Sequence, residues 1–147
     1  MNILSSTSFF FIFLSNILFS QITFEELDIQ MAEKPKPVVI YLSSEPCAYC
    51  DIQEQQLKKN TELQKILTRD YYYLTLNSTY PHPIKFNNRI YRNIQKIHEF
   101  SKKYALNNGT YSFPTWIVFT ENYQFIYSYH GLLSSRELLL LLSPLNH

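Results

Sequence analysis

The residues with the clearest chemical potential in this 147-residue sequence are its two cysteines, Cys47 and Cys50, which are separated by Ala48 and Tyr49. A bridge between cysteines this close closes a very small loop, so it restrains the unfolded chain little. A thiolate is the nucleophile of disulfide exchange, and a second thiol within reach can release the product. The pair therefore predicts reversible redox chemistry.

Three other uses of this cysteine pair are weaker. A structural zinc site needs four ligands, and the sequence has no second Cys-x-x-Cys motif and no paired His spacing. Haem attachment needs a His directly after the second cysteine, where this chain has Asp51. A passive structural disulfide stays open as an alternative in an exported protein. We therefore expect no metal and no cofactor.

The segments around the cysteines predict how the pair is held. A continuous apolar run, VVIYL at 38–42, is typical of a strand buried on both faces. A short loop follows, and a helix is expected over 48–59. Unpaired N–H groups and the dipole at a helix start favour a thiolate. We expect Cys47 to be the exposed, attacking sulfur and Cys50 to lie about one turn further in.

The remaining pattern predicts an α/β fold of one domain. Further helices are expected at 23–34, 62–68, 94–104 and 134–142, strands at 71–77, 115–120 and 125–130, and a small hairpin at 84–91 that turns at Asn87-Asn88. A βαβ unit followed by a ββα unit gives a central mixed β-sheet flanked by helices. The hairpin would then be a small insert, within 78–93, before the helix at 94–104.

The charge pattern bears on possible partners. The formal net charge is +1, and no block of like charge stands out in the sequence. Nucleic-acid-binding proteins usually carry a basic stripe. Lys58, Lys59, Lys102 and Lys103 are too scattered along the chain to form one, so we expect no nucleic-acid partner.

The first twenty residues differ from the rest of the chain. Residues 1–20 contain no charged side chain, and residues 9–14 read FFFIFL. An apolar stretch of this kind, followed by a small residue such as Ser20, is typical of a secretory signal peptide. We therefore expect residues 1–20 to be a signal peptide and residues 21–147 to be the exported domain. If they are not cleaved, residues 1–22 would serve as a membrane anchor.

CAYC after VVIYLSSEP, SFPTWIVF further on, and the order of elements together resemble the thioredoxin family over residues 37–144. The resemblance implies that Pro114 is a cis-proline facing the cysteines, and that the backbone of Phe113 binds an extended client by β-strand addition. Proline suits that position because it lacks an N–H and costs little in the cis form. Further client contacts are expected from Pro46, Ala48 and Tyr49.

This chain departs from the family pattern at several positions. Pro46 stands where a Trp is usual, Tyr41 stands where many thioredoxins carry a buried Asp, and Thr75 stands where they carry a Lys. The usual acceptor for the proton of the second cysteine is therefore missing, and we expect water, Glu45 or Asp51 to replace it. Negative charge near the site disfavours a thiolate, which favours a reductant or moderate exchanger over a strong oxidant.

The resemblance implies a thiol-disulfide oxidoreductase. YLTLN, IKFNNRIY and SFPTWIVF are similar to segments of the secreted thioredoxin-like proteins common in the Bacteroidetes, which implies a periplasmic location. We expect a monomer whose partners are client thiols and disulfides and a membrane or soluble redox protein. Two alternatives stay open: a non-catalytic binding module that uses the groove beside Pro114, and an electron carrier docked to a membrane reductase.

Overall fold

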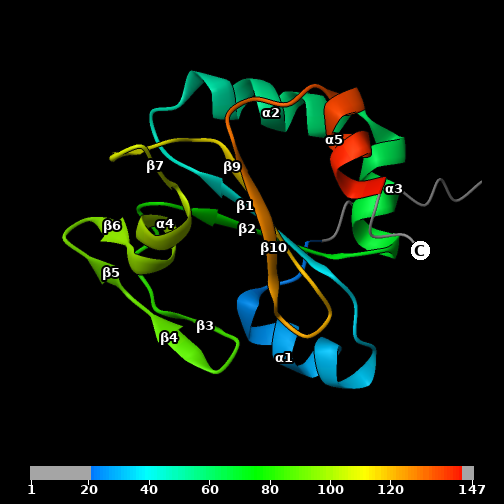
Figure 1. Cartoon of the computed structure of the whole chain (residues 1–147), viewed down its shortest axis with the longest axis horizontal. Helices are drawn as coiled ribbons and strands as arrows, with labels where there is room; N and C mark the ends of the chain where they lie inside the picture. Colours follow the sequence, from blue (N-terminus) through cyan, green and yellow to red (C-terminus); the bar gives the residue numbers. More distant parts are fainter. Residues whose placement is uncertain (1–20, 144–147) are drawn as a thin grey trace, which may run out of the picture.

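A four-stranded mixed sheet lies at the centre of the molecule (Figure 1). Its strands are β1 (Val38–Ser43), β2 (Tyr72–Asn77), β9 (Thr115–Phe119) and β10 (Phe125–His130), in the spatial order β10-β9-β1-β2. β1 and β2 run parallel, whereas β9 is antiparallel to both β1 and β10. This computed structural model, which describes residues 21–143, confirms the predicted mixed sheet.

Helices cover both faces of the sheet. They are α1 (Phe24–Glu33), α2 (Ala48–Lys59), α3 (Thr61–Arg69), α4 (Glu99–Tyr104) and α5 (Ser135–Leu142). Apolar side chains of α2, α3 and α5 pack in one core cluster, and those of α1 and α4 pack in the other. We call the first group the α2 layer and the second, with its hairpins, the α4 layer.

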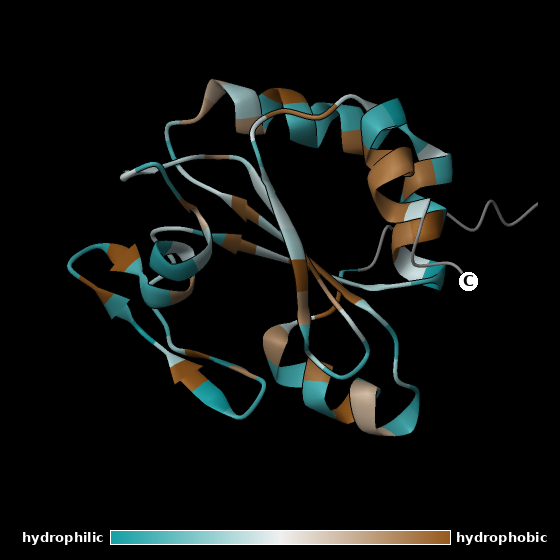
Figure 2. Ribbon diagram, in the orientation of Figure 1, coloured by the Kyte–Doolittle hydropathy of each residue, from teal (hydrophilic) through white to brown (hydrophobic). Residues whose placement is uncertain are grey.

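The central strand β1 shows why a continuous apolar run forms here. Its side chains alternate between the two core clusters, with Ile40 and Leu42 on the α4 layer side and Val39 and Tyr41 on the α2 layer side. Both faces are covered, so a polar residue would be buried at almost any position in the strand. Figure 2 shows β1 and β2 as hydrophobic stretches, while the helices alternate between teal and brown along their length.

Three small hairpins belong to the α4 layer. They pair β3 (Ile84–Phe86) with β4 (Arg89–Tyr91), β5 (Asn93–Ile94) with β6 (Ile97–His98), and β7 (Leu106–Asn107) with β8 (Thr110–Tyr111). Asn87 and Asn88 both have positive φ, which confirms the predicted tight turn between β3 and β4. The insert expected within 78–93 therefore contains the predicted hairpin.

The helix predicted to begin at residue 94 begins only at Glu99. Residues 93–98 form a second hairpin instead, because Gln95 and Lys96 adopt positive φ, which no helix tolerates. The Glu99 carboxylate accepts a hydrogen bond from the Arg92 N–H (2.7 Å), and the Glu99 N–H donates to the Arg92 carbonyl (2.8 Å). These bonds close the hairpin, so the spacing of isoleucines that suggested a helix serves a hairpin.

Helix starts carry the caps that their sequences predict. Asn60 caps α3, and Ser134 caps α5 in a reciprocal arrangement with Glu137. No helix among residues 21–143 is both long and apolar enough to span a bilayer. The predicted signal peptide at 1–20 lies outside the described residues.

Candidate active site

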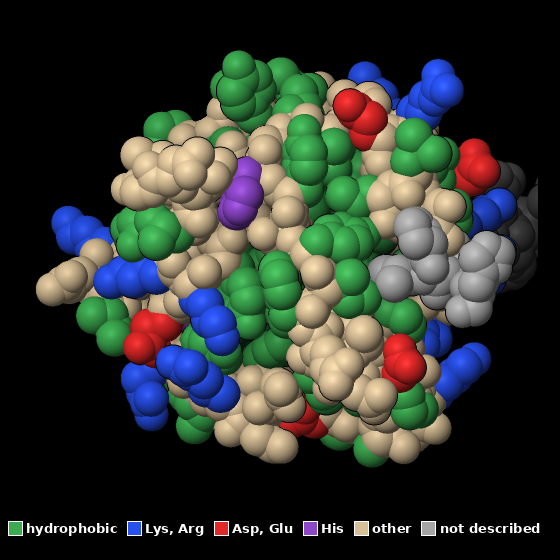
Figure 3. Space-filling model, viewed as in Figure 1, with side chains coloured by type: hydrophobic (Ala, Val, Ile, Leu, Met, Phe, Trp, Pro, Cys, Tyr) green, Lys and Arg blue, Asp and Glu red, His purple; other side chains and the backbone are tan. Residues whose placement is uncertain are grey.

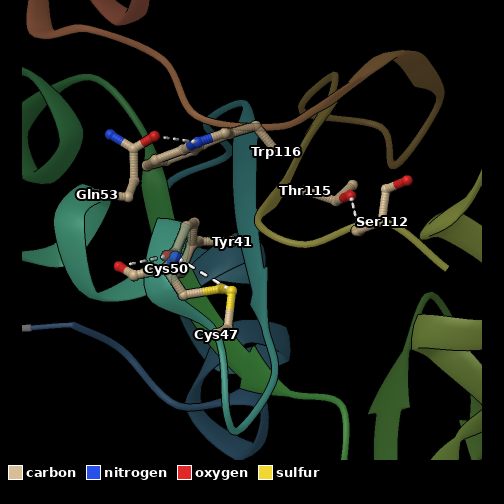
Figure 4. Close-up of a disulfide and its surroundings, with 7 residues drawn as sticks. All are labelled: Tyr41, Cys47, Cys50, Gln53, Ser112, Thr115 and Trp116. Carbon is tan, nitrogen blue, oxygen red and sulfur yellow. Dashed lines mark hydrogen bonds between the residues drawn. A yellow bond between two sulfur atoms is a disulfide. The ribbon is translucent and has the colours of Figure 1, made fainter.

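Cys47 and Cys50 form a disulfide at the start of α2, with 5.2 Å between their Cα atoms (Figure 4). Cys47 is the N-cap residue of the helix, and its sulfur accepts a hydrogen bond from the Cys50 N–H at 3.1 Å. Cys47 is partly exposed, whereas Cys50 is only 2% exposed. A sulfur held against a helix-start N–H is stabilised as a thiolate, so Cys47 has the setting of an attacking thiol.

The residues around the cysteines form an exposed rim. Pro46, Ala48 and Tyr49 are all exposed, and the side chain of Tyr49 is 62% accessible. The peptide bond between Glu45 and Pro46 is cis. An exposed aromatic ring beside a reactive sulfur offers a contact surface to a polypeptide that approaches it.

The segment Ser112–Thr115 lies at the same end of the sheet as the cysteine loop. Thr115 at the start of β9 pairs with Leu42 near the end of β1, and the chain reaches Cys47 five residues later. The peptide bond between Phe113 and Pro114 is cis. The Thr115 hydroxyl donates to the Ser112 carbonyl at 2.7 Å and closes the turn around these two residues (Figure 4).

Phe113 and Pro114 differ in what they leave available. Pro114 is buried, and its carbonyl accepts a hydrogen bond from the Gly131 N–H at 2.7 Å. Within residues 21–143, the N–H and carbonyl of Phe113 have no hydrogen-bond partner. An unpaired extended backbone of this kind can accept an added strand.

Tyr41 lies directly beneath the disulfide, at the position where a buried carboxylate is usual. Its hydroxyl donates a hydrogen bond to the Cys50 carbonyl at 3.3 Å, and its ring is 4.8 Å from that of Trp116. Burial raises the pKa of Tyr41, and the negative charges of Glu54 and Asp51 raise this pKa further. The phenol therefore stays protonated and positions Cys50 without taking its proton.

Glu54 is a candidate site residue that the sequence-based expectations missed. It is half-buried and lines a cavity of about 310 Å³ together with Tyr41, Lys58 and Thr75. Glu45 and Asp51, which were expected to replace the missing carboxylate, are both exposed. The available signal was spacing, because a residue four positions after Cys50 lies on the same helix face.

Gln53 joins the helix that carries the cysteines to the rest of the fold. It is fully buried, and its amide oxygen accepts hydrogen bonds from the Trp116 indole N–H (3.3 Å) and the Leu133 N–H (2.9 Å). Its amide nitrogen donates to the Leu133 carbonyl at 2.9 Å. These three bonds fix α2 against β9 and the segment before α5, and thereby fix the cysteines relative to the cis-proline turn.

Histidines and acidic residues gather nowhere as a metal site. Across residues 21–143, no three His, Cys, Asp or Glu side chains are close enough to hold an ion together. His98, the most buried histidine, has other partners: its Nδ1 accepts from the Phe100 N–H at 3.3 Å, and its Nε2 lies 3.2 Å from the His82 carbonyl oxygen. Its ring nitrogens are thus occupied by backbone groups.

The family model of the thioredoxin-like domain matches residues 24–145, which is most of the chain. This chain belongs to the thioredoxin-like family. The fold and the cysteine pair described above are therefore family features, and they are consistent with thiol-disulfide oxidoreductase activity. No protein with a curated description matches the chain.

Solved structures of low sequence identity share the fold of this thioredoxin-like protein. A thioredoxin-fold protein from Helicobacter pylori is 20% identical, with a TM-score of 0.59 over 74% of this chain and 68% of its own. The C-terminal domain of DsbD from Neisseria meningitidis is 14% identical, with a TM-score of 0.57 over 83% of this chain and 92% of its own. A thioredoxin from Thermus thermophilus is 15% identical, with a TM-score of 0.57 over 82% of this chain and 80% of its own.

Proposed function

We propose that this protein is a thiol-disulfide oxidoreductase that exchanges disulfides with exported proteins or with a partner redox protein. The observation that carries this proposal is the asymmetry of the pair, with Cys47 partly exposed at the helix start and Cys50 buried behind it. Two cysteines in a purely structural bridge need no such difference in access. A switchable pair does, because one sulfur must meet the client while the other waits.

The reaction proceeds in two exchanges. In the reduced protein, the Cys47 thiolate attacks one sulfur of a client disulfide and releases the other as a thiolate. The Cys50 thiolate then attacks the Cys47 sulfur of this mixed disulfide. The client leaves with two thiols, and the protein keeps the Cys47–Cys50 disulfide. A redox partner that donates two electrons restores the dithiol, and the same steps in reverse oxidise a client.

The client lies against the cis-proline turn. The free N–H and carbonyl of Phe113 pair with its extended backbone, and Pro114 keeps a competing donor out of the site. Pro46, Ala48 and Tyr49 contact the side chains that flank the client disulfide. Such backbone pairing accepts many sequences, which suits an enzyme with more than one client.

Glu54 accepts the proton of Cys50. A buried thiol has a raised pKa, so the second exchange needs an acceptor nearby. Glu54 lies one helical turn after Cys50 and faces a cavity of about 310 Å³, which has room for water to carry the proton between them. The proton then passes from the carboxylate to solvent.

The protein works as a monomer outside the cytoplasm, in the periplasm. The uncharged apolar segment at 1–20 supports export, either with cleavage or with residues 1–22 kept as an anchor. Sequencing the N-terminus of the protein recovered from the cell envelope distinguishes these two forms. A mature protein that begins near Gln21 is expected.

Trapping tests the proposed activity. A Cys50→Ser variant cannot complete the second exchange, so mixed disulfides at Cys47 should accumulate and appear as bands lost on reduction. The matched control, Cys47→Ser, should capture none. Wild type should also accelerate insulin reduction by dithiothreitol.

Two results would contradict oxidoreductase activity: no captured client with Cys50→Ser, together with no acceleration of insulin reduction by wild type. Client binding that is unchanged in the Cys47→Ser, Cys50→Ser double variant would instead favour the non-catalytic binding module. The two functions therefore separate on whether binding needs the sulfurs.

A further inference from the structure

Charge is distributed unevenly over this chain. Residues 78–111 carry six basic and one acidic side chain, a net of +5, whereas the other residues carry seven basic and eleven acidic, a net of −4. The basic residues of this segment are Lys85, Arg89, Arg92, Lys96, Lys102 and Lys103. A formal net charge of +1 for the whole chain conceals this separation.

Folding gathers these basic residues over the small hairpins and α4. The guanidinium of Arg89 lies 4.8 Å from the centre of the Tyr91 ring, and the ammonium of Lys103 lies 6.0 Å from it. Lys103 also lies 5.0 Å from the ring of Tyr104. Figure 3 shows Lys and Arg side chains clustered over the region of β3–β6 and α4. We call this surface the basic face.

Most of this charge has no internal partner. Lys85 pairs with Asp28 of α1 at 2.7 Å. Within residues 21–143, no carboxylate lies at ion-pair distance from the other five basic residues of the segment. Glu99, the acidic residue among them, accepts from the Arg92 backbone N–H. Like charges held together repel one another, so an anion on this face would be stabilised.

The basic face adjoins the cis-proline turn. Lys102 and Lys103 lie in the last turn of α4, and the next residue, Ala105, accepts a hydrogen bond from the Ser112 N–H at 2.9 Å. This bond closes the base of the β7–β8 hairpin, so the end of α4 and the residue before Phe113 lie side by side. A polypeptide paired with Phe113 can therefore continue over β7–β8 onto the basic face.

We infer that the basic face binds an acidic segment of the polypeptide whose disulfide is exchanged. The inference rests on the proposed function and adds a substrate preference to it: clients or redox partners with Asp and Glu flanking the reactive disulfide. Arg89 and Lys103, held over aromatic rings, lose little freedom when they meet a carboxylate. The remaining basic side chains steer the acidic segment toward the site.

Two other accounts explain less of the face. Lys102 and Lys103 complement the C-terminal end of the α4 dipole, but this leaves the four basic residues of the hairpins unexplained. An anionic lipid surface would also attract the face, and Ile90 and Ile94 are exposed on it. Contact with the cis-proline turn favours a polypeptide, because a lipid has no use for an adjoining strand-pairing site.

The test uses peptides that share one disulfide core and differ in one flank, either Asp/Glu-rich or Gln/Asn-rich. Three substitutions on the face, Arg89→Gln, Arg92→Gln and Lys103→Gln, should lower kcat/KM for the acidic peptide about tenfold and change that for the neutral peptide less than twofold. A charge-matched control carries Lys59→Gln, Lys65→Gln and Arg136→Gln, all exposed on the α2 layer, and should behave as wild type. About 0.5 M salt should remove the preference of wild type.

Binding separates failure of this inference from failure of the proposed function. A cysteine-free acidic peptide, followed by fluorescence anisotropy, should bind wild type and the control but not the triple variant, whether or not exchange occurs. Equal affinity for acidic and neutral peptides, or binding retained by the triple variant, would overturn the inference. So would anionic vesicles that bind through these three residues while the peptides show no preference.

Discussion

The two layers that cover the sheet are held together in different ways. In the α2 layer, regular helices supply their own backbone hydrogen bonds, and Gln53 fixes them to the sheet. In the α4 layer, the hairpins have strands of only two or three residues, so side chains must do more. Phe100 makes edge or tilted contacts there with Phe24, Phe86, Tyr91 and Tyr104.

This difference matches a division of labour. The α2 layer needs a helix start at a fixed place, because the N-cap N–H groups hold the Cys47 sulfur. The α4 layer needs an outer surface that carries many basic side chains, and an aromatic interior leaves that surface free. The chemistry therefore depends on one precise backbone feature, while recognition is spread over a face. The predictions below test that division, from the largest expected effect to the smallest.

Cys47→Ser should abolish disulfide exchange without disturbing the fold. We expect insulin reduction to fall by on the order of a thousandfold or more, because the attacking atom is gone. The free energy of unfolding should stay within about 1 kcal/mol of that of reduced wild type, since serine is nearly isosteric at a partly exposed cap and caps a helix well. Stopped reduction assays and urea denaturation measure the two quantities. A large loss of stability would show that this cysteine also supports the fold.

Phe100→Ala should have the opposite profile. Phe100 is fully buried among aromatic rings, so its truncation should lower the free energy of unfolding by about 3–5 kcal/mol. Ile29→Ala, at an exposed position of α1, is the control and should cost less than about 0.5 kcal/mol. Activity per folded molecule should be unchanged when measured on insulin. A large activity loss in folded protein would break the division between the layers.

Gln53→Ala tests the polar link of the α2 layer. The substitution leaves the Trp116 indole N–H and both backbone groups of Leu133 without partners, which should cost roughly 2–3 kcal/mol. Gln55→Ala, exposed on the same helix, should be close to neutral. Chemical denaturation checks both values. Equal stability of the two variants would mean that water replaces the lost bonds.

Glu54→Gln should slow the second exchange about tenfold near pH 7, because the Cys50 proton loses its acceptor. The mixed disulfide should persist longer, and the pH profile of its resolution should shift to higher pH while the rate of the first attack is unchanged. Glu62→Gln, exposed on α3, is the charge-matched control. A merely structural role would lower stability and leave the pH profile where it is.

His98 should give the smallest effect. Burial lowers the pKa of His98, because the charged ring is poorly solvated there. A lowered pKa means that the unfolded chain binds the proton more readily, so the histidine costs no stability above about pH 6.5 and an increasing amount as the pH falls below it. Protonation would also put a hydrogen on Nδ1, which now accepts from the Phe100 N–H. The thermal midpoint of His98→Gln should therefore fall less between pH 7 and pH 5 than that of wild type.

Local patterns in the sequence were sufficient for the α2 layer. The apolar run 38–42 could only be a strand covered on both faces, and the polar stretch after Cys47 could only be a surface helix. The caps at Asn60 and Ser134 followed from residue type. These features depend on neighbours within about one helical turn, so periodicity reports them directly.

The sequence was misleading where two conformations share one pattern. Ile94, Ile97 and Tyr104 recur at helical spacing, yet Gln95 and Lys96 turn the chain back. The choice depends on the bond between Glu99 and Arg92, seven residues apart, and on packing that the hairpin gains in the α4 layer. Propensity alone cannot weigh those contacts against a short helix.

By itself, the sequence determined the identity and order of the reacting sulfurs, because a Cys-x-x-Cys motif after a buried strand places one cysteine at a helix start. Only the tertiary structure decided what surrounds them. Glu54, rather than Glu45 or Asp51, shares a cavity with Tyr41, since the helix turns it inward. The basic residues of 78–111 looked scattered along the chain and became one face, because hairpins bring distant positions together.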